Sequence, residues 1–311
     1  MTTEIAQLAS DIRAFKIYYT ATWTLLAYDY CLTFLDEIEF AWNSEQTLAS
    51  ILFLLNRYLS LIFSTVVLIS YYLPSWTYAV CAFLCNRFAV TEFVYTVLIF
   101  TIAEIFLALR VHVLTRRNRY ISAFLALHIL VQLGLAFYNL SLGGGAAQFP
   151  PFPNLLDPNA FQVCILFPED RALTLSVTYL SLGLSFDAFV LAATLITTIS
   201  AARGHQAKRW IWVVQRDGVL YFLAIFSSTL IWLLFNQYGR SVLKLINAVP
   251  NLIFISVMIN RLYLSLKKAG REDTRHTLVF FGRPERLHNT EVELQVMVSQ
   301  QITSTMLWYP R

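Results

Sequence analysis

Charged residues are scarce in this sequence. Asp, Glu, Lys and Arg make up 14% of the 311 residues, whereas soluble globular proteins are about one quarter charged. Hydrophobic residues make up 57% of the chain. A chain with so little polar surface is excluded from the ordinary soluble class, and its composition is typical of an integral membrane protein.

The chain also lacks the basic surface that nucleic-acid binding requires. Its formal net charge is only +4, and its Lys and Arg residues lie in short groups beside apolar segments. Residues 1–16 contain no positively charged start followed by an apolar core and a small-residue cleavage site. We therefore expect no cleaved signal peptide, no nucleic-acid partner, and the lipid bilayer as the main partner.

Seven apolar segments are each long enough to cross a bilayer, at about 19 residues or more. They are Ile17–Leu35, Leu48–Tyr71, Ala89–Val113, Tyr120–Leu142, Leu173–Ile199, Asp217–Gln237 and Val242–Leu264. Because lipid offers no hydrogen-bond partners to the backbone, each segment is predicted to be a helix. The predicted fold is an all-α, polytopic bundle of seven transmembrane helices over 17–264. It follows a short segment, 1–16, and precedes a largely flexible tail, 265–311.

The distribution of basic residues predicts the orientation. Lys and Arg lie in the loops that follow the third and fifth segments, and again after the seventh, whereas the long loop Gly143–Asp170 contains neither. Cytoplasmic loops collect Lys and Arg, so we expect the N-terminus outside and the C-terminus in the cytoplasm. This is a receptor-like topology, in the plasma membrane or another membrane of the secretory pathway. The basic inner loops and tail are the candidate surface for a cytoplasmic signalling partner.

Several short motifs stand in a fixed order along the chain. The motif residues are Tyr28, Asp29, Tyr30, Asp36, Glu37, Trp42, Asn56, Arg57, Tyr58, Arg110, Arg216, Asp217, Gly218, Tyr221 and Phe222. Together with Asn260-Arg261-Leu262 near the end of the last segment, they resemble a family of fungal multi-pass membrane proteins, domain of unknown function 6533. The resemblance implies a membrane architecture and no assigned activity.

Asp29 and Arg57 lie within the first and second apolar segments. A lone charge near the bilayer centre costs roughly 3 kcal/mol, and a partner of opposite sign offsets that cost. The two positions are predicted to differ in depth by only about 5 Å, so we expect an ion pair that clamps the helical hairpin. A proton or ion relay is the alternative role. The remaining alternatives are that Arg57 extends to the interface, or pairs with Glu104 or with the acids of the turn.

Other candidates are polar residues isolated within apolar segments. They are Glu104, His128, Gln132, Asn139, Asp187, Asn247 and Asn251. Spacings of four and seven place His128, Gln132 and Asn139 on one helix face. Such residues join helices by hydrogen bonds or line a cavity for a polar ligand, and both interpretations stay open. Pro250 is predicted to kink the seventh helix.

The four cysteines suggest one disulfide bond. Cys81 and Cys85 precede the third segment and Cys164 lies in the long outer loop, all on the oxidising face of the predicted topology. A bridge between Cys85 and Cys164 would hold that loop, with Cys81 as the alternative partner. The other interpretation is that all of them are reduced packing residues, as Cys31 within the first segment is expected to be.

Seven segments in this orientation suggest a receptor-like or sensory protein without an identified ligand. A small transporter that uses the intramembrane charges and a structural or accessory membrane protein are the alternatives. Enzyme activity is not expected, because only His128 of the five histidines falls well within a segment, and a zinc site needs about three converging ligands. No cofactor is expected.

Overall fold

The computed structural model describes residues 2–43, 47–72, 78–115, 117–141, 170–203, 209–240 and 243–281, and it confirms the all-α prediction. The seven α-helices in this part of the chain are α1 (Thr2–Glu37), α2 (Leu48–Tyr72), α3 (Tyr78–Leu114), α4 (Arg119–Ser141), α5 (Asp170–Arg203), α6 (Arg209–Tyr238) and α7 (Ala248–Phe281). Two short elements accompany them, the π-helix η1 (Ile38–Trp42) and the 3-10 helix η2 (Leu243–Leu245).

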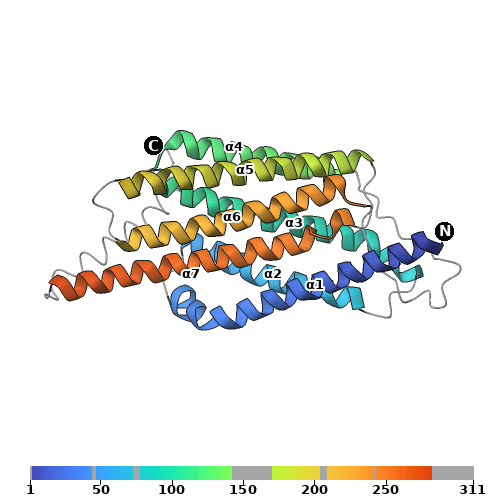
Figure 1. The fold of residues 1–311 in the computed structure, drawn as a ribbon, viewed down its shortest axis with the longest axis horizontal. Helices are drawn as coiled ribbons and strands as arrows, with labels where there is room; N and C mark the ends of the chain where they lie inside the picture. Colours follow the sequence, from blue (N-terminus) through green and yellow to red (C-terminus); the bar gives the residue numbers. More distant parts are fainter. Residues whose placement is uncertain are drawn as a thin grey trace, which may run out of the picture.

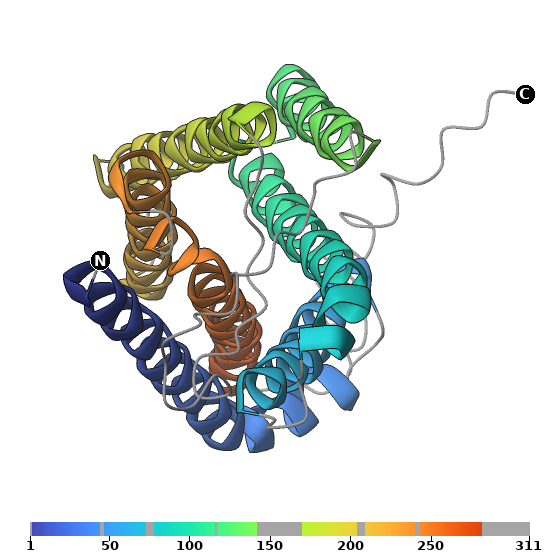
Figure 2. The same ribbon diagram turned by 90° about the vertical axis from the view of Figure 1, so that its right-hand side faces the viewer.

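The helices run side by side along the long axis of the molecule (Figure 1). Viewed along that axis, α7 lies inside the arrangement of the other helices (Figure 2). It packs against α1, α2, α3 and α6. The most apolar part of α7 is therefore 72% buried, against 22% for α4 at the edge of the bundle. α7 is the central helix.

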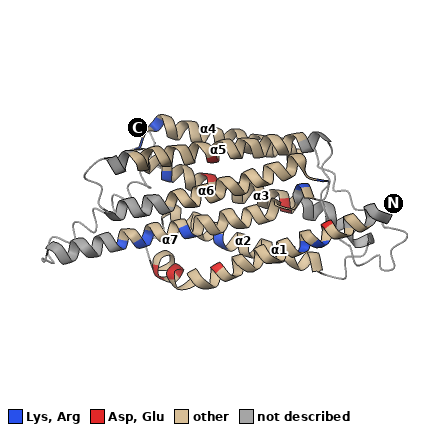
Figure 3. Ribbon diagram, in the orientation of Figure 1, with Lys and Arg blue, Asp and Glu red and all other residues tan. Residues whose placement is uncertain are grey.

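Within the described residues, six helices, α2 to α7, contain stretches that are long and apolar enough to cross a membrane. Most of the described ribbon carries no charged residue (Figure 3). Large apolar side chains also cover the outer surface, as Leu130, Phe137 and Ile196 illustrate with exposed fractions above 60%. A soluble protein rarely exposes such a surface, whereas lipid tails solvate it without cost. The chain is a multi-pass membrane protein.

α1 extends well beyond the boundaries that the sequence predicts for the first segment. It begins at Thr2, so the residues expected to precede the first span are helical too. Its inner face packs Ile12, Phe15, Tyr19 and Leu26 against α2 and α7. The many Thr, Tyr and Trp residues of α1 lower its hydropathy, and it is not among the six candidate spans.

The first part of the acidic turn after α1, as far as Asn43, has a defined structure. The helix widens into η1, which ends at Trp42, and the chain then enters α2 through Thr47. The hydroxyl of Thr47 accepts a 3.3 Å hydrogen bond from the backbone amide of Ser50, as an N-cap residue does. This turn places Glu37 at 0% exposure.

The predicted kink in α7 is wrong. α7 begins at Ala248, so Pro250 lies in the first helical turn, where its missing amide hydrogen is not needed. The segment predicted as one seventh helix is instead interrupted before Pro250, between η2 and α7. At its other end α7 continues to Phe281, so the first part of the segment expected to be a flexible tail is helical.

Candidate functional site

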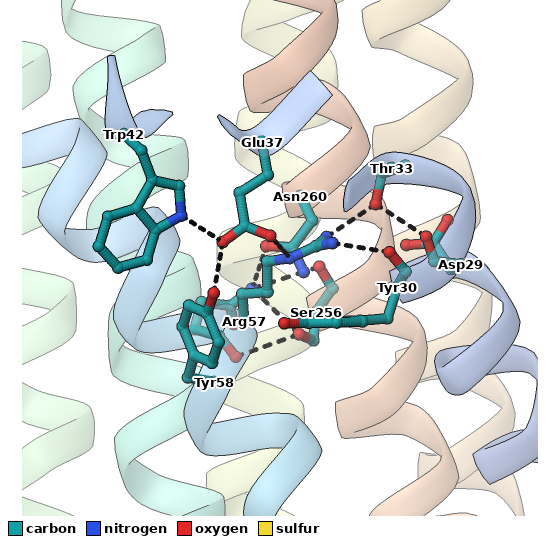
Figure 4. Close-up of polar contacts among 10 residues, drawn as sticks. Asp29, Tyr30, Thr33, Glu37, Trp42, Arg57, Tyr58, Ser256 and Asn260 are labelled. Carbon is teal, nitrogen blue, oxygen red and sulfur yellow. Dashed lines mark hydrogen bonds and ion pairs between the residues drawn. The ribbon is translucent and has the colours of Figure 1, made fainter. Parts of the chain in front are cut away.

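The most complete polar site lies where α1, η1 and α2 meet, and all of its residues except Thr33 are motif residues (Figure 4). We call Tyr30, Thr33, Glu37, Trp42, Arg57 and Tyr58 the signature cluster. Its centre is an ion pair between Arg57 Nε and Glu37 Oε2 at 2.8 Å, with the two side chains 2% and 0% exposed.

The carboxylate of Glu37 is held from a second side. Trp42 Nε1 and the Tyr58 hydroxyl both donate to Glu37 Oε1, at 3.0 and 2.7 Å. Tryptophan and tyrosine combine a large apolar body with one donor, so they can close a buried site and still satisfy an acid. Glu37 therefore accepts two hydrogen bonds and forms an ion pair with Arg57.

The guanidinium of Arg57 is also held by α1. Its Nη1 donates to the Thr33 hydroxyl at 2.8 Å, and its Nη2 donates to the Tyr30 carbonyl at 3.1 Å. Its central carbon lies 4.5 Å from the centroid of the Tyr30 ring. Residues 30, 33 and 37 are three and four apart, so they share one face of α1 and meet Arg57 together.

The predicted ion pair between Asp29 and Arg57 is wrong. Asp29 is buried and pairs instead with Arg261 of α7, with Asp29 Oδ1 and Arg261 Nε 2.6 Å apart. Successive helical residues point about 100° apart. The face of α1 that carries Tyr30 is turned to α2, so Asp29 is turned to α7. The alternative that Arg57 pairs with an acid of the turn is confirmed, and that acid is Glu37.

Asn56 joins the same region to α7. It is fully buried, and its Nδ2 donates to the carbonyl and hydroxyl of Ser256 at 3.2 and 3.1 Å and to Asn260 Oδ1 at 3.0 Å. Ser50, which precedes Asn56 in α2, shares a 2.8 Å hydrogen bond with Tyr263, which follows Asn260 in α7. The central helix is thus held by two motif residues, Asp29 and Asn56, and by Ser50.

A second group of motif residues meets between α3 and α6. Arg110 is 7% exposed, and its guanidinium lies 4.9 Å from the centroid of the Phe222 ring. The space it occupies exists because residue 218 is glycine, since a Cβ there would lie 2.1 Å from Arg110 Nη2. Tyr221 is half-buried nearby. The side chains of Arg216 and Asp217 lie outside the described residues.

Substituting Gly218 by Ala is therefore expected to destabilise the protein by about 1–3 kcal/mol, because the buried guanidinium must move. The matched control is Gly134→Ala in α4, where the added methyl group meets nothing within 4 Å. That change should be neutral or stabilise slightly, since alanine favours helix more than glycine does. Thermal unfolding of both variants in detergent micelles measures the difference, and equal midpoints would contradict the packing of Arg110 on Gly218.

Three of the isolated polar candidates come together in the middle of the bundle. Glu104 of α3, Gln132 of α4 and Asp187 of α5 are 4%, 2% and 7% exposed. Glu104 is close to Gln132 and within electrostatic range of Asp187. We call these three residues the inner cluster. Sequence spacing alone did not group them, because they lie on three different helices.

The other polar candidates lie elsewhere. His128 Nε2 and the Ser185 hydroxyl are 3.0 Å apart at the exposed contact of α4 and α5, which supports helix joining at that position. Asn247 accepts a 2.7 Å hydrogen bond from the Tyr18 hydroxyl and donates to the Ser228 carbonyl at 3.3 Å. Neither residue belongs to the inner cluster.

Asn139 and Asn251 make no side-chain hydrogen bond within the described part of the chain. Asn139 is half-buried near the end of α4. Asn251 is fully buried, and neither its Oδ1 nor its Nδ2 has a hydrogen-bond partner there.

Two motif residues, Tyr28 and Asp36, make no polar contact in this site, and most of the cysteine side chains lie outside the described residues. Tyr28 is exposed and Asp36 is half-buried, and neither makes a polar side-chain contact among the described residues. Cys164 lies outside the described residues, as do the side chains of Cys81 and Cys85. The disulfide stays a prediction. Cys31 is a free, exposed cysteine.

Arg261 and Ser256 are the site residues that sequence reasoning missed as partners. Arg261 belonged to the Asn260-Arg261-Leu262 motif, so its type and place gave a signal, although nothing in the sequence assigned it to Asp29. The sequence did not mark Ser256 as a site residue, because serines that hydrogen-bond to a neighbouring helix are common in membrane helices.

Comparison with known proteins agrees with the location of this site. No curated protein and no solved structure matches the chain. Residues 17–62, which contain the motif residues of α1 and α2, match the Family of unknown function (DUF6533).

Proposed function

We propose that this protein is a receptor-like or sensory seven-helix membrane protein, with α1 as the seventh span. The observation that carries the proposal is the place of α7. Near its start the central helix has a buried amide, Asn251, with no hydrogen-bond partner among the described residues, and the ion pair of Arg261 with Asp29 lies ten residues further on. Those ten residues correspond to about 15 Å of helix.

A helix with contacts at two depths can transmit binding at one face to the other. A ligand shifts such an equilibrium only if it binds one arrangement of the helix better than the other. Near its start α7 offers Asn251, a polar group free to bind a ligand, and further along it offers contacts that a shift would break. This is the physical requirement for a receptor.

The second candidate function is a small transporter, which the two buried acids of the inner cluster favour. Glu104 and Asp187 form no ion pair within the described residues, and carriers of ions place such groups near the bilayer centre. A structural or accessory role is the third candidate, since the signature cluster by itself stabilises the bundle.

The proposed orientation places the N-terminus outside and the C-terminus in the cytoplasm, because the loop Gly143–Asp170 contains no Lys or Arg. A tag inserted near Gly144 is expected to bind antibody on intact cells, and a tag after Arg311 only after permeabilisation. The reverse pattern would contradict the orientation.

Purified protein in liposomes separates the three functions. A receptor is expected to accelerate guanine-nucleotide exchange on added heterotrimeric G proteins, a transporter to give ion flux, and a structural protein to give neither. For a receptor, Arg261→Gln should change the basal exchange rate because it releases α7 from Asp29. The matched control is Arg271→Gln, which removes an exposed ion pair with Glu39 and should leave exchange unchanged. Absence of exchange with every G protein tested contradicts the receptor proposal.

A further inference from the structure

The inner cluster contains two buried carboxyl groups on neighbouring helices. Glu104 and Asp187 are both nearly inaccessible, on helices α3 and α5 that pack directly against each other. Glu104 Oε1 and Asp187 Oδ2 have no hydrogen-bond partner within the described residues, and neither acid forms an ion pair there.

Among the described residues, no basic side chain of the surrounding helices forms an ion pair with them. Arg110 is the next cation along α3, about 9 Å further on, and its guanidinium lies against Gly218 and Phe222. His128 of α4 is engaged at the exposed edge with Ser185. Two ionised carboxylates within electrostatic range of each other in a low-dielectric interior are strongly unfavourable unless a cation or a proton neutralises one of them.

Gln132 provides an independent observation that points to a ligand. It is 2% exposed, and its Oε1 and Nε2 form no hydrogen bond of full geometry within the described part of the chain. Its amide lies close to the Glu104 carboxyl group and the Tyr179 hydroxyl, and a Cβ on Gly183 would lie 3.3 Å from Gln132 Nε2. An amide buried this deeply normally has its partners, because each unmade hydrogen bond costs about 1–3 kcal/mol.

The three residues together offer the ligands of a hard cation. Carboxylate and amide oxygens are what Ca²⁺ and other hard cations coordinate, often with waters in the remaining positions. Within the described residues no three His, Cys, Asp or Glu side chains lie together, so the nitrogen and sulfur ligands of a transition metal are not gathered here. Thr229 of α6 lies beside Asp187 and adds a hydroxyl oxygen to the same region.

We propose that Glu104, Gln132 and Asp187 form a binding site for a hard inorganic cation inside the helical bundle, held by oxygen atoms from α3, α4 and α5. Ca²⁺ balances both carboxylates by itself, and Na⁺ balances one while the other keeps a proton. The site ties three helices together, so occupancy stabilises the folded protein. It does not depend on whether the protein signals or transports.

Thermal unfolding of the purified protein in detergent tests the site. NaCl and CaCl₂ are titrated separately against N-methylglucamine chloride at constant ionic strength and pH. At saturation, one of the two metal salts is expected to raise the midpoint by roughly 5 °C or more, with a saturable dependence on concentration. Glu104→Gln and Asp187→Asn should each abolish that rise.

The matched control is Glu92→Gln, the same substitution on the same helix three turns before the inner cluster, which should keep the full rise. Equilibrium binding of ²²Na⁺ or ⁴⁵Ca²⁺ to the unmodified protein gives a second measurement that does not depend on whether the variants fold. One saturable site is expected. The proposal is overturned if neither ion binds or stabilises, if Glu104→Gln keeps the rise, or if stability responds to pH alone, which would mean that protons balance the acids.

Discussion

Replacing Arg57 by Met is expected to cost the folded protein about 3–5 kcal/mol, because the buried charge of Glu37 is left without its cation. Glu37→Gln is expected to cost a similar amount, since it leaves the guanidinium with only neutral partners, Thr33 and the Tyr30 carbonyl. In the double variant no charge is buried, and the glutamine can still accept from Trp42 and Tyr58. The double variant should therefore be more stable than the sum of the two losses predicts.

The free energy of unfolding in mixed micelles, measured for the four proteins of this cycle, gives the coupling. A coupling of at least about 1 kcal/mol is expected for residues in contact. The control cycle combines Arg57→Met with Asp29→Asn. Their losses should add, because Asp29 pairs with Arg261. If the losses add in the cycle of Arg57 with Glu37 and are coupled in the cycle of Arg57 with Asp29, then Arg57 pairs with Asp29, as the sequence alone suggested.

Asn56→Leu is expected to produce the second largest loss, about 2–3 kcal/mol. The substitution leaves Asn260 Oδ1 without its donor and removes the hydrogen bonds of Asn56 to the carbonyl and hydroxyl of Ser256, in a fully buried contact between α2 and α7. A buried acceptor left without a donor costs about 1–3 kcal/mol. Hydrogen bonds between membrane helices contribute at the lower end of that range.

Asn139→Leu is the matched control for this prediction. Asn139 is half-buried on α4 and makes no side-chain hydrogen bond within the described residues, so the same substitution should change stability little. The unfolding midpoints of the two variants measure the difference in stability between Asn56→Leu and Asn139→Leu. An equal effect at both positions would mean that the contacts of Asn56 with α7 contribute nothing beyond the loss of an asparagine from a helix.

Composition and apolar length predicted the helices well wherever the segments were strongly apolar. The segment predicted as Leu48–Tyr71 is the helix Leu48–Tyr72, and the one predicted as Tyr120–Leu142 is Arg119–Ser141. The predicted boundaries are wrong at helix ends that extend beyond the apolar segment. There a helix such as α1 or α7 continues through polar residues, and hydropathy gives no signal for where it stops.

The sequence by itself determined which residues matter at the signature cluster, and tertiary structure decided how they pair. Asp29 and Arg57 stood out because a charge in an apolar segment is costly wherever it lies. Glu37 stood out only as a motif residue of the acidic turn, whose acids were an alternative partner for Arg57. The choice between Asp29 and Glu37 depended on the rotation of α1 about its axis, which the packing of α2 and α7 sets. The inner cluster shows the same limit, since Glu104, Gln132 and Asp187 are far apart in sequence and meet only because α3, α4 and α5 pack together.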